Sequence, residues 1–285
     1  MHERESRAST CACPENKYPG PAQAHAGQGS TPANTDVLRE MPASGTTLFC
    51  IPHAGGSATY YAQLKRFLPH HISFIPLELA GRGRRSREPL ATSMDVIARD
   101  LLAHIAPVAR TTPYAIFGHS MGALLALLCT LQARTESLPL PQAIFLSACA
   151  PPDMPRHRPD VPISSLTPAQ LWEHVESLGG IPPCISASAE FRSYLEPVLA
   201  ADFTAIESWQ PRPVPPLPVP ITIFLGDQDA LEEHSARAWR QYTTGAFSTH
   251  TFSGHHFYLQ DHWAALAAFM SQTLAVLHHA PKPNP

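Results

Sequence analysis

The chain has 285 residues, 44% of them hydrophobic, and a formal net charge of −3 at pH 7. This length supports one sizeable core, and a single α/β domain of roughly 240 residues with a tail fits it better than two domains. The nearly balanced charge argues against a nucleic-acid partner, and the lack of an apolar run of 18 residues argues against a membrane span.

The six cysteines favour a reducing compartment. Their spacing shows neither a disulfide framework nor paired zinc ligands. Cys50, Cys129 and Cys149 lie in apolar runs, where free cysteines behave as small buried hydrophobes. The charged start, MHERESRAST, lacks the apolar segment of a secretory signal. We therefore expect a cytoplasmic protein without a metal site.

Composition divides the chain into a folded domain and two tails. Residues 1–43 are rich in small and polar residues and poor in large aliphatic ones, which predicts a disordered N-terminal extension. Met41, just before the first expected strand, is a candidate initiator. The folded domain is expected over residues 44–279, followed by a C-terminal tail over residues 280–285.

The first half of the domain alternates apolar runs with helical patterns. The expected strands and helices, in chain order, are strand 46–51, helix 60–68, strand 72–77, strand 114–117, helix 123–134 and strand 143–147. Ser93 is the expected N-cap of a further helix before the third strand. The apolar residues of that helix recur at helical spacing, at Met94, Ile97, Leu101, Ile105 and Val108.

An irregular block then interrupts the alternation. Residues 151–218 carry helical patterns over 168–178 and 189–208 but no convincing strand. Beyond the block, the expected elements are strand 221–225, helix 233–242, strand 247–252 and helix 261–277. The alternation predicts an α/β fold with a mostly parallel central sheet and helices on both faces. The block is then an insertion at the edge where such sheets bind ligands, and we expect a helical lid.

The second lid helix carries an apolar stripe with two interpretations. Its members are Leu195, Val198, Leu199, Phe203 and Ile206. The stripe could pack on the core, or it could line a substrate site, and the sequence leaves both open.

The motif Gly118-His119-Ser120-Met121-Gly122 carries the clearest chemical signal. It follows a short apolar strand and opens an apolar helix, which is the context of a nucleophile elbow. The sharp turn strains the Ser120 backbone, and side chains at positions 118 and 122 would collide with neighbouring strands. The sequence therefore predicts Ser120 as a nucleophile.

A nucleophilic serine needs a base, and the base needs an orienting acid. In this fold class the acid and then the histidine follow the serine along the chain. The turn after the last expected strand offers His255 and His256, of which we favour His256. For the acid, the turn after the preceding strand offers Asp227 and Asp229. We favour Asp229, because Asp227 directly follows Gly226 and could brace the turn.

Asp153 is a third candidate acid, since it follows the strand over residues 143–147. Acyl transfer also needs two backbone N–H donors for the developing oxyanion. One is expected from Met121, the residue after the nucleophile. The second is expected from Ala54, in the glycine-rich loop PHAGG after the first strand.

A basic cluster follows the second expected strand. Its members are Arg82, Arg84, Arg85 and Arg87. The cluster is either a solvated loop or a docking surface for an acidic carrier protein or a pantetheine phosphate, since arginine suits bidentate phosphate contacts.

Several motifs together resemble the stand-alone type II thioesterases of peptide and polyketide assembly lines, which belong to the α/β-hydrolase superfamily. They are LFCIPHAGGSATYY, ELAGRGRR, YAIFGHSMGALLAL, LGGIP and SGHHFYL, and the resemblance covers roughly residues 46–275. Two departures stand out: His255 replaces the second Gly of a common Gly-Gly-His, and Ala80 replaces the Pro of a common LPGRG.

The resemblance implies an enzyme that hydrolyses acyl or aminoacyl thioesters on the phosphopantetheine arm of carrier proteins. It assigns Ser120, Asp229 and His256 to the catalytic triad and Ala54 and Met121 to the oxyanion hole. It also implies a monomer with transient acyl or peptidyl carrier partners. No dissociable cofactor is expected, because the substrate itself carries the phosphopantetheine.

Three other functions remain open. One is a medium-chain fatty acyl thioesterase, which the resemblance marks as the nearest neighbour. The second is a general carboxylesterase with the same triad and different binding loops. The third is a carrier-binding scaffold with a vestigial triad, against which the intact set of Ser120, Asp229 and His256 argues.

Overall fold

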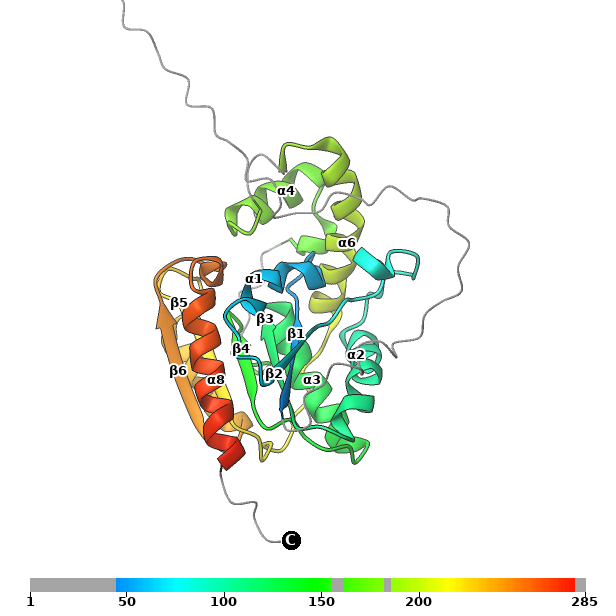
Figure 1. The fold of residues 1–285 in the computed structure, drawn as a ribbon. Coiled ribbons are helices and arrows are strands. Elements are labelled where there is room, and N and C mark those ends of the chain that lie inside the picture. The colour runs from blue at the N-terminus through cyan, green and yellow to red at the C-terminus, as the bar shows by residue number, and fades with distance from the viewer. Residues whose placement is uncertain (1–44, 155–160, 182–185, 280–285) are drawn as a thin grey trace, which may run out of the picture.

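The computed structural model describes residues 45–154, 161–181 and 186–279 (Figure 1). The predicted N-terminal extension, including Met41, and the predicted C-terminal tail lie outside these residues. None of the helices in the described ranges is long and apolar enough to cross a membrane.

A six-stranded sheet forms the centre of the molecule, with strand order β2-β1-β3-β4-β5-β6 and every neighbouring pair parallel. The strands are β1 (Thr46–Ile51), β2 (Ile72–Pro76), β3 (Tyr114–His119), β4 (Ile144–Ser147), β5 (Ile221–Gly226) and β6 (Phe247–Phe252). All residues of β1, β3, β4 and β5 are buried, as continuous apolar runs in a covered parallel sheet require. The predicted α/β architecture with a mostly parallel central sheet is confirmed.

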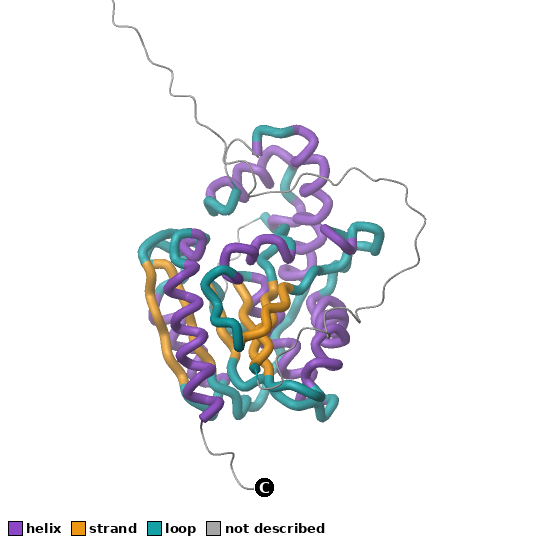
Figure 2. The backbone as a smooth tube through the Cα atoms, in the orientation of Figure 1, coloured by secondary structure: helices purple, strands orange, loops and turns teal. Residues whose placement is uncertain are grey.

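Helices cover both faces of the sheet and its carboxyl edge (Figures 1 and 2). The longer ones are α2 (Met94–Ala109), α3 (Met121–Thr135), α4 (Pro168–Ser177), α6 (Ala189–Ser208) and α8 (Trp263–His279). The short ones are η2 (Ala58–Tyr61), α1 (Ala62–Lys65), η3 (Gly83–Arg85), η4 (Ile163–Ser165), α7 (Glu233–Arg237), η5 (Ala238–Tyr242) and η6 (Tyr258–Gln260).

Two helix predictions need correction, and a third prediction holds in position only. The helices expected over residues 60–68 and 233–242 each divide into a 3₁₀ turn and a short α-helix. Ser93 is the N-cap residue of α2, as predicted, although its side chain makes no capping hydrogen bond. A full capping box occurs instead at α4, where the Thr167 side chain accepts from the Gln170 N–H and the Gln170 side chain accepts from the Thr167 N–H.

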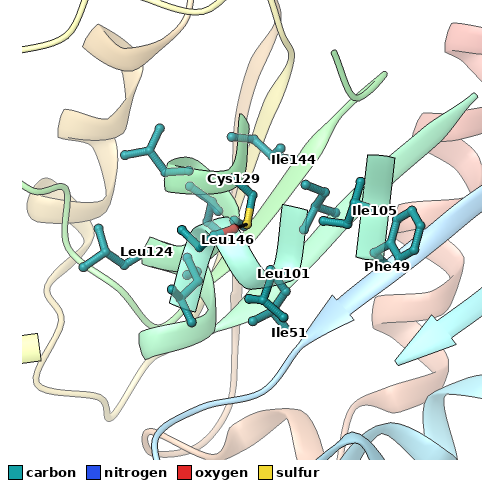
Figure 3. Close-up of a cluster of buried hydrophobic side chains, with 14 of the residues drawn as sticks. Phe49, Ile51, Leu101, Ile105, Leu124, Cys129, Ile144 and Leu146 are labelled. Carbon is teal, nitrogen blue, oxygen red and sulfur yellow. Dashed lines mark hydrogen bonds between the residues drawn. The ribbon is translucent and has the colours of Figure 1, made fainter. Parts of the chain in front are cut away.

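Successive side chains along the strands point to opposite faces of the sheet and pack into two separate hydrophobic cores. On β1, Phe49 and Ile51 join the core under α2 and α3, whereas Leu48 and Cys50 join the core under α1 and α8. Figure 3 shows the first core, where the Cys129 thiol donates to the Ala98 carbonyl at 3.5 Å. Cys50 and Cys129 are buried free thiols, as predicted, and burial raises the pKa of both; Cys149 is half-buried.

The inserted block between β4 and β5 places α4 and α6 above the carboxyl edge of the sheet (Figure 1). The two helices share a third apolar cluster, formed by Leu171, Trp172, Val175, Leu195, Val198, Leu199 and Phe203. Trp172 also donates from its indole N–H to Glu196 at 2.6 Å. The insertion therefore has its own small core, which holds its helices together over the edge where strand ends deliver polar side chains.

Candidate active site

Ser120 occupies a strained turn between β3 and α3. Its φ of 55° and ψ of −117° lie in a region of backbone conformation where residues other than glycine are rarely found. A Cβ at position 122 would lie 2.1 Å from the Ile51 carbonyl oxygen at the end of β1, as predicted. A Cβ at position 118 would lie 2.1 Å from the Gly122 carbonyl oxygen, so there the collision is with the first turn of α3 and not with a neighbouring strand. The two glycines therefore permit the elbow that exposes the serine.

Three side chains from separate strand ends meet at this elbow. Ser120 Oγ lies 3.1 Å from His256 Nε2. His256 Nδ1 lies 3.1 Å from Asp229 Oδ2 and 3.2 Å from Asp229 Oδ1. Asp229 follows β5, and its side chain is 5% exposed; His256 follows β6, and its side chain is 17% exposed. This is the relay in which a hydroxyl donates to one ring nitrogen while the other nitrogen donates to a buried carboxylate.

The competing candidates have other partners. His255 is exposed, and its Nδ1 lies 3.2 Å from the Gln228 carbonyl oxygen. Asp227 accepts a hydrogen bond from the Gly254 N–H at 2.9 Å, so it braces the turn, as predicted for that residue. Asp153 accepts from the Tyr242 hydroxyl at 2.8 Å and from the Gln241 amide at 2.6 Å. Asp153 is therefore not the acid of this site.

Of the two expected oxyanion donors, Met121 directly follows the serine, and Ala54 lines the same cavity as the serine. Met121 is the first residue of α3, where a backbone N–H has no partner within the helix. Ala54 lies in the turn after β1, which the Gly56 N–H closes by donating to the His53 carbonyl at 2.9 Å. Ala54 lines the same cavity as Ser120 and His256. Gly55 has a φ of +76°, which a glycine adopts without strain.

A cavity of about 810 Å³ extends from the serine beneath the lid. The lid side of its lining is apolar and includes Val175, Leu195, Val198, Leu199, Phe203 and Ile206. The exposed side chains of Lys65 and Arg84 also line it. Four members of the predicted stripe, Leu195, Val198, Leu199 and Phe203, both pack against α4 and line the cavity. The cavity can hold an apolar acyl group beside the reactive hydroxyl.

Two histidines near His256 had no predicted role: His119 is buried, and His53 is half-buried. The ring centroids of His119 and His256 are 5.1 Å apart, and His119 Nδ1 lies 2.9 Å from Ser147 Oγ. Ser147 Oγ in turn lies 2.7 Å from the Tyr258 hydroxyl. Burial lowers the pKa of His119 well below its usual value and, with His256 and Arg82 acting in the same direction, lowers the pKa of His53 to about 3. Both rings are therefore neutral at physiological pH. His53 lies in the PHAGG loop and His119 in the GHSMG motif, so the sequence placed both next to the site without indicating this role.

Neither interpretation of the arginine cluster, a solvated loop or a docking surface, fits two of its four members. Arg82 is buried and forms an ion pair with Asp202 of α6. Arg85 donates to Asp100 at 2.6 and 2.8 Å and also pairs with Glu88. The sequence could not indicate these ion pairs, because the partners Asp202 and Asp100 are distant from the arginines along the chain. Arg84 and Arg87 are exposed.

Known proteins resemble the chain over most of its length. The sequence pattern of the thioesterase domain family matches residues 46–274. The gramicidin S biosynthesis protein GrsT of Aneurinibacillus migulanus is 33% identical over 236 residues, which cover 81% of this chain and 89% of GrsT. The medium-chain S-acyl fatty acid synthase thioesterase of Rattus norvegicus is 30% identical, with coverage of 80% and 88%. The solved structure of the type II thioesterase BorB from the borrelidin biosynthetic cluster matches with a TM-score of 0.75 at 31% identity, and the match covers 83% of this chain and 95% of BorB.

Proposed function

From the premise that this chain belongs to the thioesterase domain family and is a hydrolase of thioester bonds, we propose that it removes acyl or aminoacyl groups from carrier proteins of natural-product biosynthesis. The observation that carries the proposal is the contact series Ser120–His256–Asp229 at the mouth of an apolar cavity. A family pattern alone is compatible with a vestigial site. Three side chains in hydrogen-bonding distance beside a cavity of suitable polarity support an active one.

The acylation half of the reaction begins at the elbow. His256 Nε2 takes the Ser120 hydroxyl proton as the oxygen attacks the thioester carbonyl, and Asp229 stabilises the resulting imidazolium. The N–H groups of Ala54 and Met121 donate to the oxyanion of the tetrahedral intermediate, and the loss of one such donor typically costs about 10²–10³ in kcat. The carbon–sulfur bond then breaks, and His256 returns the proton to the departing phosphopantetheine thiol.

The second half removes the acyl group from the serine. His256 takes a proton from a water molecule as the water oxygen attacks the acyl-serine carbonyl. The bond between the carbonyl carbon and Ser120 Oγ breaks, the serine recovers its proton from His256, and the free acid leaves. Each of these steps uses side chains and amides of this chain, and the phosphopantetheine belongs to the substrate.

The partners follow from the substrate. An acyl group on a phosphopantetheine arm is delivered by an acyl or peptidyl carrier protein, which associates transiently. We expect the chain to act as a monomer, because the three side chains and both amides of the site come from one polypeptide. The buried free thiols of Cys50 and Cys129 fit a reducing compartment, and we place the reaction in the cytoplasm.

A medium-chain fatty acyl thioesterase is the second candidate. The relationship to the rat enzyme favours it, as does the apolar lid side of a cavity of about 810 Å³. A panel of carrier proteins loaded with short, branched, medium-chain and aminoacyl groups distinguishes the two functions. Preference for short or aminoacyl groups supports the biosynthetic role, whereas a sharp optimum at medium straight chains supports the fatty acyl role.

The test of the proposed reaction compares the wild type with Ser120→Ala on acyl carrier protein, with thiol release and carrier mass as readouts. The wild type should hydrolyse the thioester faster than the matching oxygen ester, and the variant should lose several orders of magnitude in kcat. Near-normal turnover by a folded Ser120→Ala variant would reject the assignment. Equal or greater activity of the wild type on the oxygen ester would favour a general carboxylesterase instead.

A further inference from the structure

A buried ion pair joins the lid to the body of the enzyme. Arg82, just before η3, donates from Nη1 to Asp202 Oδ2 at 2.6 Å and from Nη2 to Asp202 Oδ1 at 2.7 Å. The two side chains are 3% and 0% exposed, and Asp202 belongs to lid helix α6. Burial of two charges costs desolvation energy that such a pair often only offsets, so stability alone does not account for it.

The same carboxylate reaches the loop that supplies the second oxyanion donor. Asp202 Oδ2 accepts a hydrogen bond from the Gly55 N–H at 2.7 Å. Arg82 Nη1 also lies 3.4 Å from the Gly56 carbonyl oxygen. Gly55 directly follows Ala54, the residue whose N–H is assigned to the oxyanion. Asp202 and Arg82 therefore connect this loop, the turn before η3 and helix α6.

The hydrogen bond constrains the Ala54 backbone directly. The Gly55 N–H belongs to the planar peptide unit that begins at the Ala54 carbonyl, so fixing its direction restricts ψ of Ala54. On the other side of Gly55, the Gly56 N–H donates to the His53 carbonyl and closes the turn. The lid lies tightly against the loop, since a Cβ at Gly55 would lie 2.6 Å from the Leu199 side chain. A residue of the lid therefore restricts the backbone on the carboxyl side of Ala54, whose N–H is assigned to the oxyanion.

We propose that Asp202 of the lid, held by Arg82, is a positioning residue for the oxyanion loop. The site therefore reaches its full kcat only when α6 lies against this loop. The inference rests on the proposed function and adds a role for α6 in the rate of the chemical step. Leu199 and Phe203 of the same helix line the cavity. An acyl group that seats α6 correctly should therefore raise kcat and not only lower KM.

The test uses Asp202→Ala in the full chain, with Asp202→Asn as the conservative variant. Glu207→Gln is the matched control, because Glu207 lies on the same helix and accepts from the Ile163 and Ser164 N–H groups within the lid. Two ligands separate the roles. An alkyl boronic acid forms a tetrahedral adduct at Ser120 that needs the oxyanion donors, whereas an acyl-pantetheine thioether analogue fills the cavity without needing them.

Asp202→Ala should lower kcat by about 10²-fold and weaken boronic acid binding by a similar factor, with thioether binding within about threefold of the wild type. Asp202→Asn should lie between it and the wild type, and Glu207→Gln should keep the wild-type ratio of the two affinities. Wild-type kcat and boronic acid affinity in Asp202→Ala would overturn the proposal. An equal loss of affinity for the boronic acid and for the thioether in folded Asp202→Ala or Asp202→Asn would also overturn it.

Hydrogen exchange at the Gly55 amide provides a test in the wild type that no variant can confound. The amide should be protected, and the boronic acid should increase its protection. Exchange at the rate of an unprotected amide would overturn the proposal. The outcome for Ser120→Ala keeps the two claims separate. If that variant is inactive and Asp202→Ala has wild-type kcat, only the positioning role fails; if Ser120→Ala remains active, the proposed function itself fails.

Discussion

His256 Nε2 lies 3.1 Å from Ser120 Oγ, although the two residues are 136 positions apart in the chain. The parallel sheet explains the contact, because β3, β5 and β6 all end at one edge and each delivers one member of the site there. The strained Ser120 backbone points the hydroxyl out of the turn, and the lid insertion supplies an apolar cavity above it. The chemistry thus depends on strand topology, one strained residue and one inserted pair of helices.

The assignment of the acid can be tested with two neighbouring carboxylates. Asp229→Asn should lower kcat by about 10⁴-fold, because an amide cannot hold the His256 ring in the required tautomer. Asp227→Asn is the control in the same loop, and it should stay within a few-fold of the wild type because its oxygen can still accept from the Gly254 N–H. Steady-state thioester hydrolysis measures both. A larger loss in Asp227→Asn would exchange their roles.

The assignment of the base can be tested in the same way. His256→Gln should remove nearly all turnover, since no other imidazole lies within hydrogen-bonding distance of Ser120 in the described residues. His255→Gln should retain most of it, because that ring is exposed and its Nδ1 lies beside the Gln228 carbonyl oxygen. Circular dichroism confirms that both variants are folded. High activity in His256→Gln would contradict the assignment.

The elbow glycines predict a stability difference. Gly122→Ala places a Cβ 2.1 Å from a backbone oxygen of β1, so the chain must shift, and we expect a loss of more than about 3 kcal/mol in the free energy of unfolding. Gly179→Ala is the control, because its Cβ would meet nothing within 4 Å and only its φ of +76° imposes strain, about 1–2 kcal/mol. Denaturant unfolding compares the two. Equal losses would show that close packing at the elbow is not limiting.

The half-buried His53 predicts a pH dependence of stability. Burial lowers its pKa from 6.5 to about 3 in the folded chain, whereas the unfolded chain titrates near 6.5. Between these values the unfolded state binds a proton that the folded state does not. The free energy of unfolding is therefore unaffected by this titration above pH 6.5 and decreases as the pH falls from 6.5 toward 3. His53→Gln should show a smaller decrease in unfolding free energy from about pH 7.5 to about pH 4.5 than the wild type. An unchanged decrease would contradict the neutral assignment.

Much of the fold and the core of the candidate site could be predicted because their signals are local. The buried strands are apolar runs, and glycines mark the turns that carry Ser120 and Ala54. The pair Arg82–Asp202 could not be predicted, because its partners are 120 positions apart and a buried ion pair has no local pattern. The same reason explains why Asp153, next to an expected strand end, looked available although Tyr242 and Gln241 bind it.

The most direct test of the account asks whether the acyl group passes through Ser120. Wild-type enzyme is mixed with an acyl carrier protein that carries a slowly released acyl group, quenched with acid on the millisecond scale, digested and analysed by mass spectrometry. The account predicts that the peptide containing Ser120 gains the mass of the acyl group at a rate no slower than product release. Steady hydrolysis with no acylated Ser120 at any time point, under conditions where release limits turnover, would contradict it.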